Sequence, residues 1–511
     1  MPAADLVRTG VTGLDAILGG GIPRANIILT EGAIGTGKTT LGVEFIYRGA
    51  REFDEPGIIV VFEVSPDKLI RDAANFGWDL AALERERKIR IVFTTRQVFR
   101  QELQQADSLL LEEAAALGAR RIFVDGGAGL VGSQNGHANG PDPREAFHVM
   151  VEGLQRENLT AMLALEASAI SPASVFMLPE ESIADTVIRL RMEETQRATV
   201  RSIEIVKSRG QDFQTGRHSL RIVDGAGIEV YRRVQAPRTG SRDRAAAFDP
   251  TTRVTTGVPG LDPIVNGGYF LGSTTVVAGI SGVGKSVMAV HYITEGARLG
   301  ERSLMLTLDE QVPQVMRNAA SIGKDLQGAV DSGLTRLHYD TPQEIDIDHH
   351  FYNIEQIMQE FKPKRVVIDS LSTYGSTLGV GRMFRDFFHA LVALMKEHQV
   401  AAVYNNENPE MLGMSSMMGE FAMSSLVDNI VLMNWVELGD VFRLGLTVAK
   451  MRANPCTRTT YECEIVSQQG MRVLERQLPI TRLDTPFSAY RSLISRTAAR
   501  QERPAGRREP A

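Results

Sequence analysis

The sequence has 511 residues, a net charge of −6 and a hydrophobic fraction of 43%. This length exceeds what a single hydrophobic core usually supports, so we expect two domains. No segment approaches the roughly 20 apolar residues of a membrane-spanning helix, and residues 1–10 lack the pattern of a signal peptide. The two cysteines, Cys456 and Cys463, suit a reducing cytoplasm. The acidic balance argues against nucleic acid as the main partner.

The first motif is a glycine-rich stretch between an apolar run at 27–29 and a helix-compatible run at 40–52. A strand, a glycine loop and a helix in this order are typical of a phosphate-binding P-loop. The glycines let backbone N–H groups turn toward phosphate oxygens, and the helix dipole favours the same anion. Lys38 would reach the β- and γ-phosphates, and Thr39 would bind Mg²⁺. The predicted ATP-binding residues are Gly32, Gly35, Thr36, Gly37, Lys38, Thr39 and Thr40.

Apolar strands are predicted next at 58–63, 89–93, 121–125 and 159–165, with helices at 97–117 and 143–157. Such continuous apolar strands are typical of a parallel sheet that is buried on both faces. Ligands bind beyond the carboxyl ends of parallel strands. Asp125, which lies 125 − 38 = 87 residues after the P-loop lysine, is therefore predicted to hold Mg²⁺ with Thr39. Glu63, at another strand end, is predicted to be the general base of hydrolysis.

Short strands separated by polar turns follow from residue 185, so the parallel core should continue into antiparallel strands. Residues 126–143 are predicted to form a loop over the site, and the Arg- and Pro-rich residues 235–250 an interdomain linker. We therefore predict a first domain at 1–234, the linker at 235–250, a second domain at 251–490 and a disordered tail at 491–511.

The second half repeats the first. Lys285 lies 285 − 38 = 247 residues after Lys38, and Asp262 lies 262 − 15 = 247 residues after Asp15, in a matching Gly-x-x-Gly-Leu-Asp segment before each P-loop. This constant offset indicates a tandem duplication. The predicted ATP-binding residues of the second half are Gly279, Gly282, Val283, Gly284, Lys285 and Ser286. Ser286 and Asp369 are predicted to hold Mg²⁺, and Asp309 or Glu310 to act as the base.

One further group of side chains, Asp346, Asp348, His349 and His350, has the chemistry of a metal site. The interpretation that we favour is the solvated start of a helix that runs to residue 361. The Met-rich stretch 411–423 is interpreted as a packing or subunit surface.

With these motifs in view, the chain resembles the double-domain KaiC family of circadian-clock ATPases, within the RecA/DnaB superfamily. The resemblance rests on the doubled P-loop, the segment before each P-loop, residues 76–80 and Lys450-Met451-Arg452. It implies an α/β fold of two tandem RecA-like P-loop NTPase domains. Each would have a mostly parallel sheet, helices on both faces and an antiparallel C-terminal extension. It also implies an ATP-assembled homohexamer of two stacked rings that contains Mg²⁺, a cytoplasmic location, and KaiB-like or other signalling partners.

Roles carried over from the family complete the prediction. Lys207 and Arg209, and likewise Lys450 and Arg452, would reach the nucleotide of a neighbouring subunit. Ser424 and Ser425 occupy the position of the family's Ser-Thr phosphorylation pair. Three departures stand out. Val64 replaces the second of two paired glutamates in the first half, and Asp309 replaces the leading glutamate of the pair in the second half. Ser425 replaces the threonine of the phosphorylation pair.

Three functions remain open at this point. The first is a KaiC-like ATPase and serine autokinase that works as a signalling or timing hexamer. The second is a RecA-class DNA-binding motor, whose intersubunit sites would look alike. The third is a regulatory scaffold in which ATP only assembles the ring.

Overall fold

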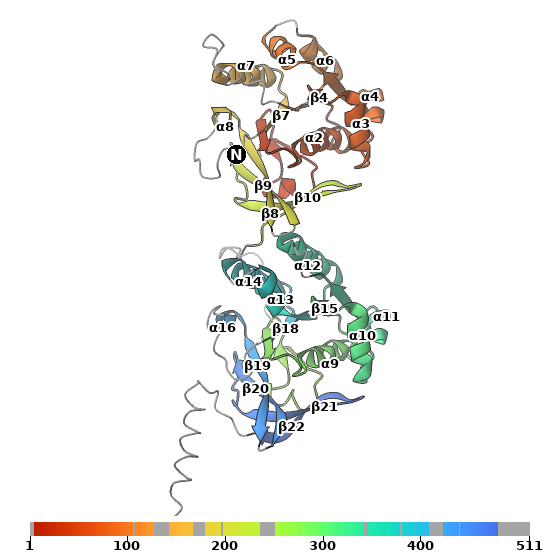
Figure 1. The fold of residues 1–511 in the computed structure, drawn as a ribbon, viewed down its shortest axis with the longest axis vertical. Helices are drawn as coiled ribbons and strands as arrows, with labels where there is room; N and C mark the ends of the chain where they lie inside the picture. Colours follow the sequence, from red (N-terminus) through yellow and green to blue (C-terminus); the bar gives the residue numbers. More distant parts are fainter. Residues whose placement is uncertain are drawn as a thin grey trace, which may run out of the picture. The chain divides into compact units, whose positions relative to one another are not determined.

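The computed structural model describes residues 5–105, 108–126, 143–166, 179–195, 198–235, 251–341, 346–378, 381–407, 423–438 and 440–478. The chain divides into two compact units, residues 1–233 and 234–511 (Figure 1). Four of the predicted segments fall mainly outside the described residues: the loop over the first site, the linker, the Met-rich stretch 411–423 and the C-terminal tail.

The first unit alternates strands and helices before it ends in four consecutive strands. Its elements are β1 (Leu6–Val7), α1 (Leu14–Ile17), β2 (Ile22–Pro23), β3 (Ile27–Gly32), α2 (Lys38–Glu52), β4 (Gly57–Val61), α3 (Pro66–Ala74), α4 (Leu80–Arg85), β5 (Ile89–Phe93), α5 (Arg96–Gln104), α6 (Leu109–Leu117), β6 (Arg121–Val124), α7 (Pro143–Arg156), β7 (Thr160–Glu166), α8 (Pro179–Ile183), β8 (Thr186–Thr195), β9 (Ala198–Ser208), β10 (Arg217–Val223) and β11 (Gly227–Tyr231).

The main sheet of the first unit has nine strands in the order β11-β10-β9-β8-β3-β7-β6-β4-β5. The six strands from β8 to β5 in this order pair in parallel, whereas β8 to β11 pair antiparallel. The predicted α/β fold with an antiparallel extension is thereby confirmed. Because the parallel strands share one direction, the loop after β3 and the residues after β4 and β6 meet at one edge of the sheet.

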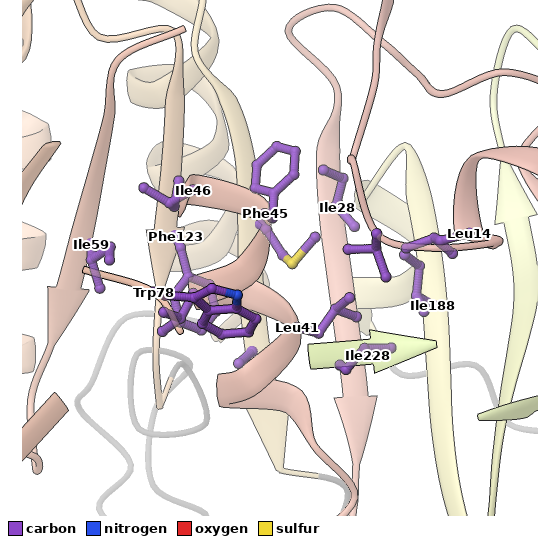
Figure 2. Packing of buried hydrophobic residues seen from close by; sticks show 14 of the residues in the cluster. Leu14, Ile28, Leu41, Phe45, Ile46, Ile59, Trp78, Phe123, Ile188 and Ile228 are labelled. Carbon is purple, nitrogen blue, oxygen red and sulfur yellow. The ribbon is translucent and has the colours of Figure 1, made fainter. Parts of the chain in front are cut away.

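Alternate residues of the parallel strands pack on opposite faces. On one face, Ile28, Ile59 and Phe123 pack against α2, as Figure 2 shows. On the other face, neighbours such as Ile58 and Ile122 pack against α5, α6 and α7. Figure 1 likewise shows α3 and α4 beside α2, and α5, α6 and α7 on the opposite side of the strands. Since burying each such side chain contributes about 1.5–3 kcal/mol, the two-sided core holds the edge with the P-loop in place.

The second unit repeats this arrangement. Its elements are β12 (Arg253–Val254), β13 (Tyr269–Phe270), β14 (Thr274–Gly279), α9 (Lys285–Arg298), β15 (Ser303–Thr307), α10 (Val312–Ser321), α11 (Leu326–Asp331), β16 (Thr335–Tyr339), α12 (Ile347–Phe361), β17 (Arg365–Asp369), α13 (Leu371–Leu378), α14 (Arg382–Glu397), β18 (Ala401–Glu407), α16 (Met423–Leu426), β19 (Asn429–Leu438), β20 (Val441–Met451), β21 (Thr460–Val466) and β22 (Gly470–Leu478).

Its nine-stranded sheet has the order β16-β15-β17-β18-β14-β19-β20-β21-β22. The strands from β16 to β19 in this order pair in parallel, and β19 to β22 pair antiparallel. The equivalent strands of the two units therefore lie in equivalent places. Helices α9 to α11 pack on one face of the sheet and α12 to α14 on the other.

The repeated segment before each P-loop makes a close contact with the last strand of the sheet. Gly13 has a φ of 77°, and a Cβ there would lie 1.9 Å from the carbonyl oxygen of Val230 in β11. Gly260 repeats this contact at 2.1 Å from the carbonyl oxygen of Val473. Glycine is therefore required at both positions. The Asp15 carboxylate closes the first of these turns, since it accepts hydrogen bonds from the N–H and hydroxyl of Thr9 at 2.8 and 2.7 Å.

A buried arginine opens β6 and another opens β17. The Arg121 guanidinium is 0% exposed and lies 2.5 Å from the Glu55 carboxylate. Arg365, also 0% exposed, lies 2.7 Å from Glu301. Both pairs lie at the amino ends of the parallel strands, away from the edge that carries the P-loops.

One predicted element is wrong. Residues 97–117 do not form a single helix, because α5 ends at Gln104 and α6 starts at Leu109. Ser108 caps α6 by accepting a hydrogen bond from the Leu111 N–H at 3.1 Å. Its hydroxyl also donates to Glu102 at 2.9 Å. This polar cap ends the helical pattern that apolar spacing alone would have continued.

Candidate functional site

The first P-loop connects β3 to α2 with the backbone that its glycines require. Gly35 and Gly37 have φ values of 82° and 102°, and a Cβ on Gly32 would lie 2.6 Å from the Leu190 carbonyl oxygen. The Lys38 ammonium donates to the carbonyl oxygens of Gly32 and Ala33 at 2.7 and 2.8 Å. The lysine therefore lies across its own loop.

The second P-loop repeats this geometry between β14 and α9. Gly282 and Gly284 have φ values of 82° and 90°, and the Lys285 ammonium donates to the carbonyl oxygens of Gly279 and Ile280 at 2.8 Å each. A lysine, a ring of loop N–H groups and a helix start are a donor set that suits a triphosphate. Burial lowers the pKa of Lys38 and of Lys285, and a bound polyanion would oppose that shift.

Three of the predicted ATP-binding residues differ from the P-loop lysines and glycines in what their side chains contact. The Thr36 hydroxyl donates to the Ala33 carbonyl inside the loop at 2.9 Å, and Val283 is buried in the core of the second unit. The side chains of Thr36 and Val283 are thus occupied within the protein, and the Thr36 N–H also donates to the Ala33 carbonyl at 3.4 Å. Thr40 is half-buried on the first turn of α2.

The predicted metal-binding pairs lie together in both units. The Thr39 hydroxyl donates to Asp125 at 3.0 Å, and the Ser286 hydroxyl donates to Asp369 at 2.8 Å. Burial raises the pKa of Asp125 and of Asp369. A hydroxyl and a carboxylate are oxygen ligands of the kind that Mg²⁺ uses beside ATP phosphates, so the residues fit this ion.

The predicted base of the first unit has a cationic partner that the sequence did not reveal. Arg96 at the start of α5 lies 2.5 Å from the Glu63 carboxylate and donates to the Gly126 carbonyl at 3.0 Å. Gly126 directly follows Asp125, so this guanidinium bridges two strand ends beside the P-loop. Glu63 itself is 72% exposed along its side chain, and Arg96 is what orients it.

In the second unit, the two candidate bases point to different partners. Glu310 accepts from the Asn318 amide of α10 at 3.0 Å. Asp309 instead accepts hydrogen bonds from Ser370 at 2.8 Å and from Thr373. Because Ser370 follows Asp369 in the chain, the geometry favours Asp309 as the base. Ser370 and Thr373 are two further residues that sequence reasoning missed.

Lys207, Arg209, Lys450 and Arg452 contact short helices of their own chain. Lys207 donates to three carbonyls at the end of α8, those of Glu181, Ser182 and Ala184, at 2.9, 3.1 and 2.5 Å. Arg209 donates to the Ser182 carbonyl at 2.9 Å. Lys450 and Arg452 repeat the pattern, with the Val427 carbonyl at 2.7 Å and the Ser425 carbonyl at 2.5 Å. Each pair thus lies at the negative end of a short helix.

Helix α16 carries the two serines predicted to be phosphorylated. The side chain of Ser424 lies outside the described residues, whereas Ser425 is exposed. The Asp428 carboxylate lies 3.2 Å from Arg452, so cations and an acid surround the end of this helix.

A buried acid beside the first P-loop is another residue that the sequence did not reveal. Glu31, the residue before Gly32, is 2% exposed and pairs with Arg189, which also lies 2.8 Å from Glu181 of α8. Burial raises the pKa of Glu31 to about 7. A single acid at the end of an apolar strand is the signal that could have marked it. Arg189 therefore ties the end of β3 to α8.

The Asp/His group of the second unit has a structural role. Among the residues that the structure describes, no cluster of three acids, histidines or cysteines could hold a metal ion. A helix does start here, with Asp346 as its cap, but the expectation of a solvated helix start is wrong for His350, which is 3% exposed. Its imidazole hydrogen-bonds to Asp340 and, at 2.6 Å, to the Tyr374 hydroxyl. Packing of α12 against the sheet has buried this end of the helix.

Comparisons with known proteins agree with this geometry. A family model described as "ATPase: KaiC" matches residues 7–235 and 254–478. The circadian clock oscillator protein KaiC of Picosynechococcus is 30% identical over 455 residues, which is 88% of this chain and 86% of that protein. The circadian clock oscillator protein KaiC of Synechococcus elongatus is 29% identical over 454 residues, which is 88% of this chain and 85% of that protein. In the described ranges, no helix is long and apolar enough to span a bilayer.

Proposed function

The chain belongs to the KaiC family of ATPases, and from this premise we propose that it is a hexameric signalling ATPase that hydrolyses ATP in its first half and phosphorylates its own serines in its second. The observation that carries the proposal is the duplicated site. In each unit, a P-loop lysine lies across its own loop and a hydroxyl hydrogen-bonds to a strand-end aspartate.

The residues of the first unit suit hydrolysis. Lys38 and the loop N–H groups would hold the phosphates, and Thr39 with Asp125 would hold Mg²⁺, which neutralises charge on the phosphates when it is bound. Glu63, oriented by Arg96, would align a water molecule for attack on the γ-phosphate. A positioned base of this kind contributes about 10²–10⁴-fold to a rate.

The residues of the second unit suit transfer to a hydroxyl. Lys285, Ser286 and Asp369 would hold the nucleotide and Mg²⁺ in the same way, and Asp309 would accept the proton of the attacking serine. Ser424 and Ser425 are the proposed acceptors from a neighbouring subunit. The circadian-clock names of the relatives support a timing or signalling role, in the cytoplasm and with KaiB-like partners.

Assembly would complete the sites. Lys207 with Arg209, and Lys450 with Arg452, would act as cationic clamps on the phosphates of the adjacent subunit. To do so they would exchange the carbonyl oxygens that they contact now for phosphate oxygens. Hexamers that form with nucleotide are the expected consequence.

Intact-mass spectrometry and light scattering after incubation with Mg·ATP test the proposal together. Wild type should form hexamers, hydrolyse ATP and gain about 80 Da per phosphate on serine, whereas Lys285→Ala should keep turnover but gain no mass. Hexamers without turnover or phosphate would instead indicate an ATP-assembled scaffold. Single-stranded DNA affinity that falls steeply with salt would indicate a RecA-class motor.

A further inference from the structure

A cluster of hydroxyls surrounds the carboxylate of Asp309. The Ser370 hydroxyl donates to one carboxylate oxygen at 2.8 Å, and the Thr373 hydroxyl donates to the other. The Ser370 Oγ also lies 2.8 Å from the Ser372 Oγ, which accepts from the Glu407 N–H at 3.1 Å. A base oriented by one group and hydrogen-bonded to a second hydroxyl is the arrangement of an activated nucleophile.

This cluster lies at the end of the second sheet where ATP is expected. Ser370 follows Asp369, which accepts the hydrogen bond of Ser286 in the P-loop helix. Asp309, which accepts from the Ser370 hydroxyl, therefore lies beside the end of β17 that carries the metal-binding aspartate.

The position of Thr373 is fixed by its neighbour in α13. Tyr374 is 0% exposed, its hydroxyl lies 2.6 Å from the His350 Nε2, and its ring packs 4.8 Å from that of Phe387. Adjacent side chains of a helix point about 100° apart. Anchoring Tyr374 in the core thus holds Thr373, which is half-buried, toward Asp309.

Two of the hydroxyls have different roles. Ser370 is 4% exposed and is bonded to Asp309, Ser372 and Thr373, so it suits the orientation of the base. Thr373 is the more accessible of the two. The sequence of the first half differs here, since Gly126-Gly127-Ala128-Gly129 follow Asp125 where Ser370-Leu371-Ser372-Thr373 follow Asp369.

We propose that Thr373 is a phosphorylation site, modified by ATP bound to the P-loop of its own chain. The inference rests on the proposed kinase activity of the second half and adds an acceptor within the same subunit. The Thr373 oxygen attacks the γ-phosphorus, its proton passes to Asp309, and the bond from the γ-phosphorus to the bridging oxygen breaks. The products are phosphothreonine and ADP.

Phosphosite mapping of the denatured full-length protein, after incubation with Mg·ATP, tests this inference by a covalent mark rather than by turnover. Wild type and Thr373→Ser should carry phosphate at position 373. Thr373→Val should carry none there, and Asp309→Asn should carry at least tenfold less. Thr377→Val is the matched control, because its hydroxyl lies one turn further along α13 and, among the described residues, bonds to the Thr373 carbonyl alone, at 2.9 Å.

Mixing two variants separates transfer within a subunit from transfer between subunits. Lys285→Ala chains keep Thr373 but lack the second ATP site, whereas Thr373→Val chains keep the ATP site. After mixing and assembly, the inference predicts no phosphate at position 373, while Ser424 or Ser425 of the Lys285→Ala chains should be labelled by their neighbours.

The remaining outcomes overturn the inference. Phosphate at position 373 of the Lys285→Ala chains would show transfer between subunits. Phosphate on Ser424 or Ser425 alone in wild type would show that the hydroxyls only hold Asp309, and the proposed function would stand. Phosphate nowhere in wild type would remove both this site and the proposed kinase activity.

Discussion

At the scale of single residues, the pair of Arg96 and Glu63 is the clearest addition to the first site. We predict that Arg96→Ala lowers first-site turnover at least tenfold, because Glu63 would lose the partner that orients it. The measurement is ATP hydrolysis in a Lys285→Ala background. Glu63→Gln should lose about 10²–10⁴-fold, and adding Arg96→Ala to it should cost nothing more, since the two residues act as one unit.

Arg90→Ala is the matched control for this prediction. Arg90 forms exposed ion pairs of the same unit with Glu84 and Glu113, at 3.8 and 3.4 Å, so its loss should leave turnover unchanged. Arg96→Lys should restore part of the activity. Fully additive losses in the double variant would contradict an action of Arg96 through Glu63.

A buried glutamate makes the stability of the first unit depend on pH. Glu44 is 0% exposed, and burial raises its pKa to about 7 although it accepts from the Ile228 N–H at 2.8 Å. Between pH 4.5 and 7 the folded chain keeps this proton and the unfolded chain releases it, so stability falls as pH rises. A shift from 4.5 to about 7 corresponds to about 3 kcal/mol.

We therefore predict that Glu44→Gln stabilises the first unit at pH 8 relative to wild type, and less so at pH 4.5. Urea unfolding measured by the fluorescence of Trp78 checks this, in a Trp435→Phe background that removes the other tryptophan. Glu52→Gln is the control, because this residue of the same helix pairs with Arg48 at the surface. Equal pH dependence of wild type and Glu44→Gln would refute the prediction.

At the scale of elements, the parallel core was predictable because its strands are continuous apolar runs. The strand at 89–93 has the predicted bounds. The helix at 97–117 was wrong because the Ser108 cap interrupts it. The partners within the sites were not predictable, since they are far apart in the sequence: Arg96 and Glu63 are 33 residues apart, and Thr373 and Asp309 are 64 apart.

The segment before the P-loop provides an element-scale prediction. Gly13→Ala should destabilise the first unit by more than the roughly 1–2 kcal/mol cost of a left-handed alanine, because its Cβ would overlap the Val230 carbonyl. Gly210→Ala should show the backbone cost alone, since its φ is 83° and a Cβ there has no neighbour within 4 Å. Urea midpoints measured by Trp78 fluorescence compare the two, and equal losses would exclude close approach as the cause.

At the scale of the whole molecule, ring assembly should depend on both P-loops. We predict that Lys38→Ala and Lys285→Ala each raise the ATP concentration needed for hexamers, because each removes one set of phosphates for the proposed clamps to bind. Light scattering across an ATP titration measures this. The double variant should stay monomeric at any ATP concentration, and hexamers formed by it as readily as by wild type would disprove nucleotide-linked assembly.

The two buried arginines affect which positions of such a protein can be substituted during evolution. Arg121 and Arg365 fasten the amino ends of equivalent strands in both units, while the residues beyond the carboxyl ends differ between the units, with Gly126 in one and Ser370 in the other. The residues at the amino ends of the strands therefore stabilise each sheet, whereas the residues beyond the carboxyl ends can be substituted without loss of the fold. A library confined to positions 63, 126, 309, 370 and 373 should therefore yield mostly folded proteins with altered chemistry.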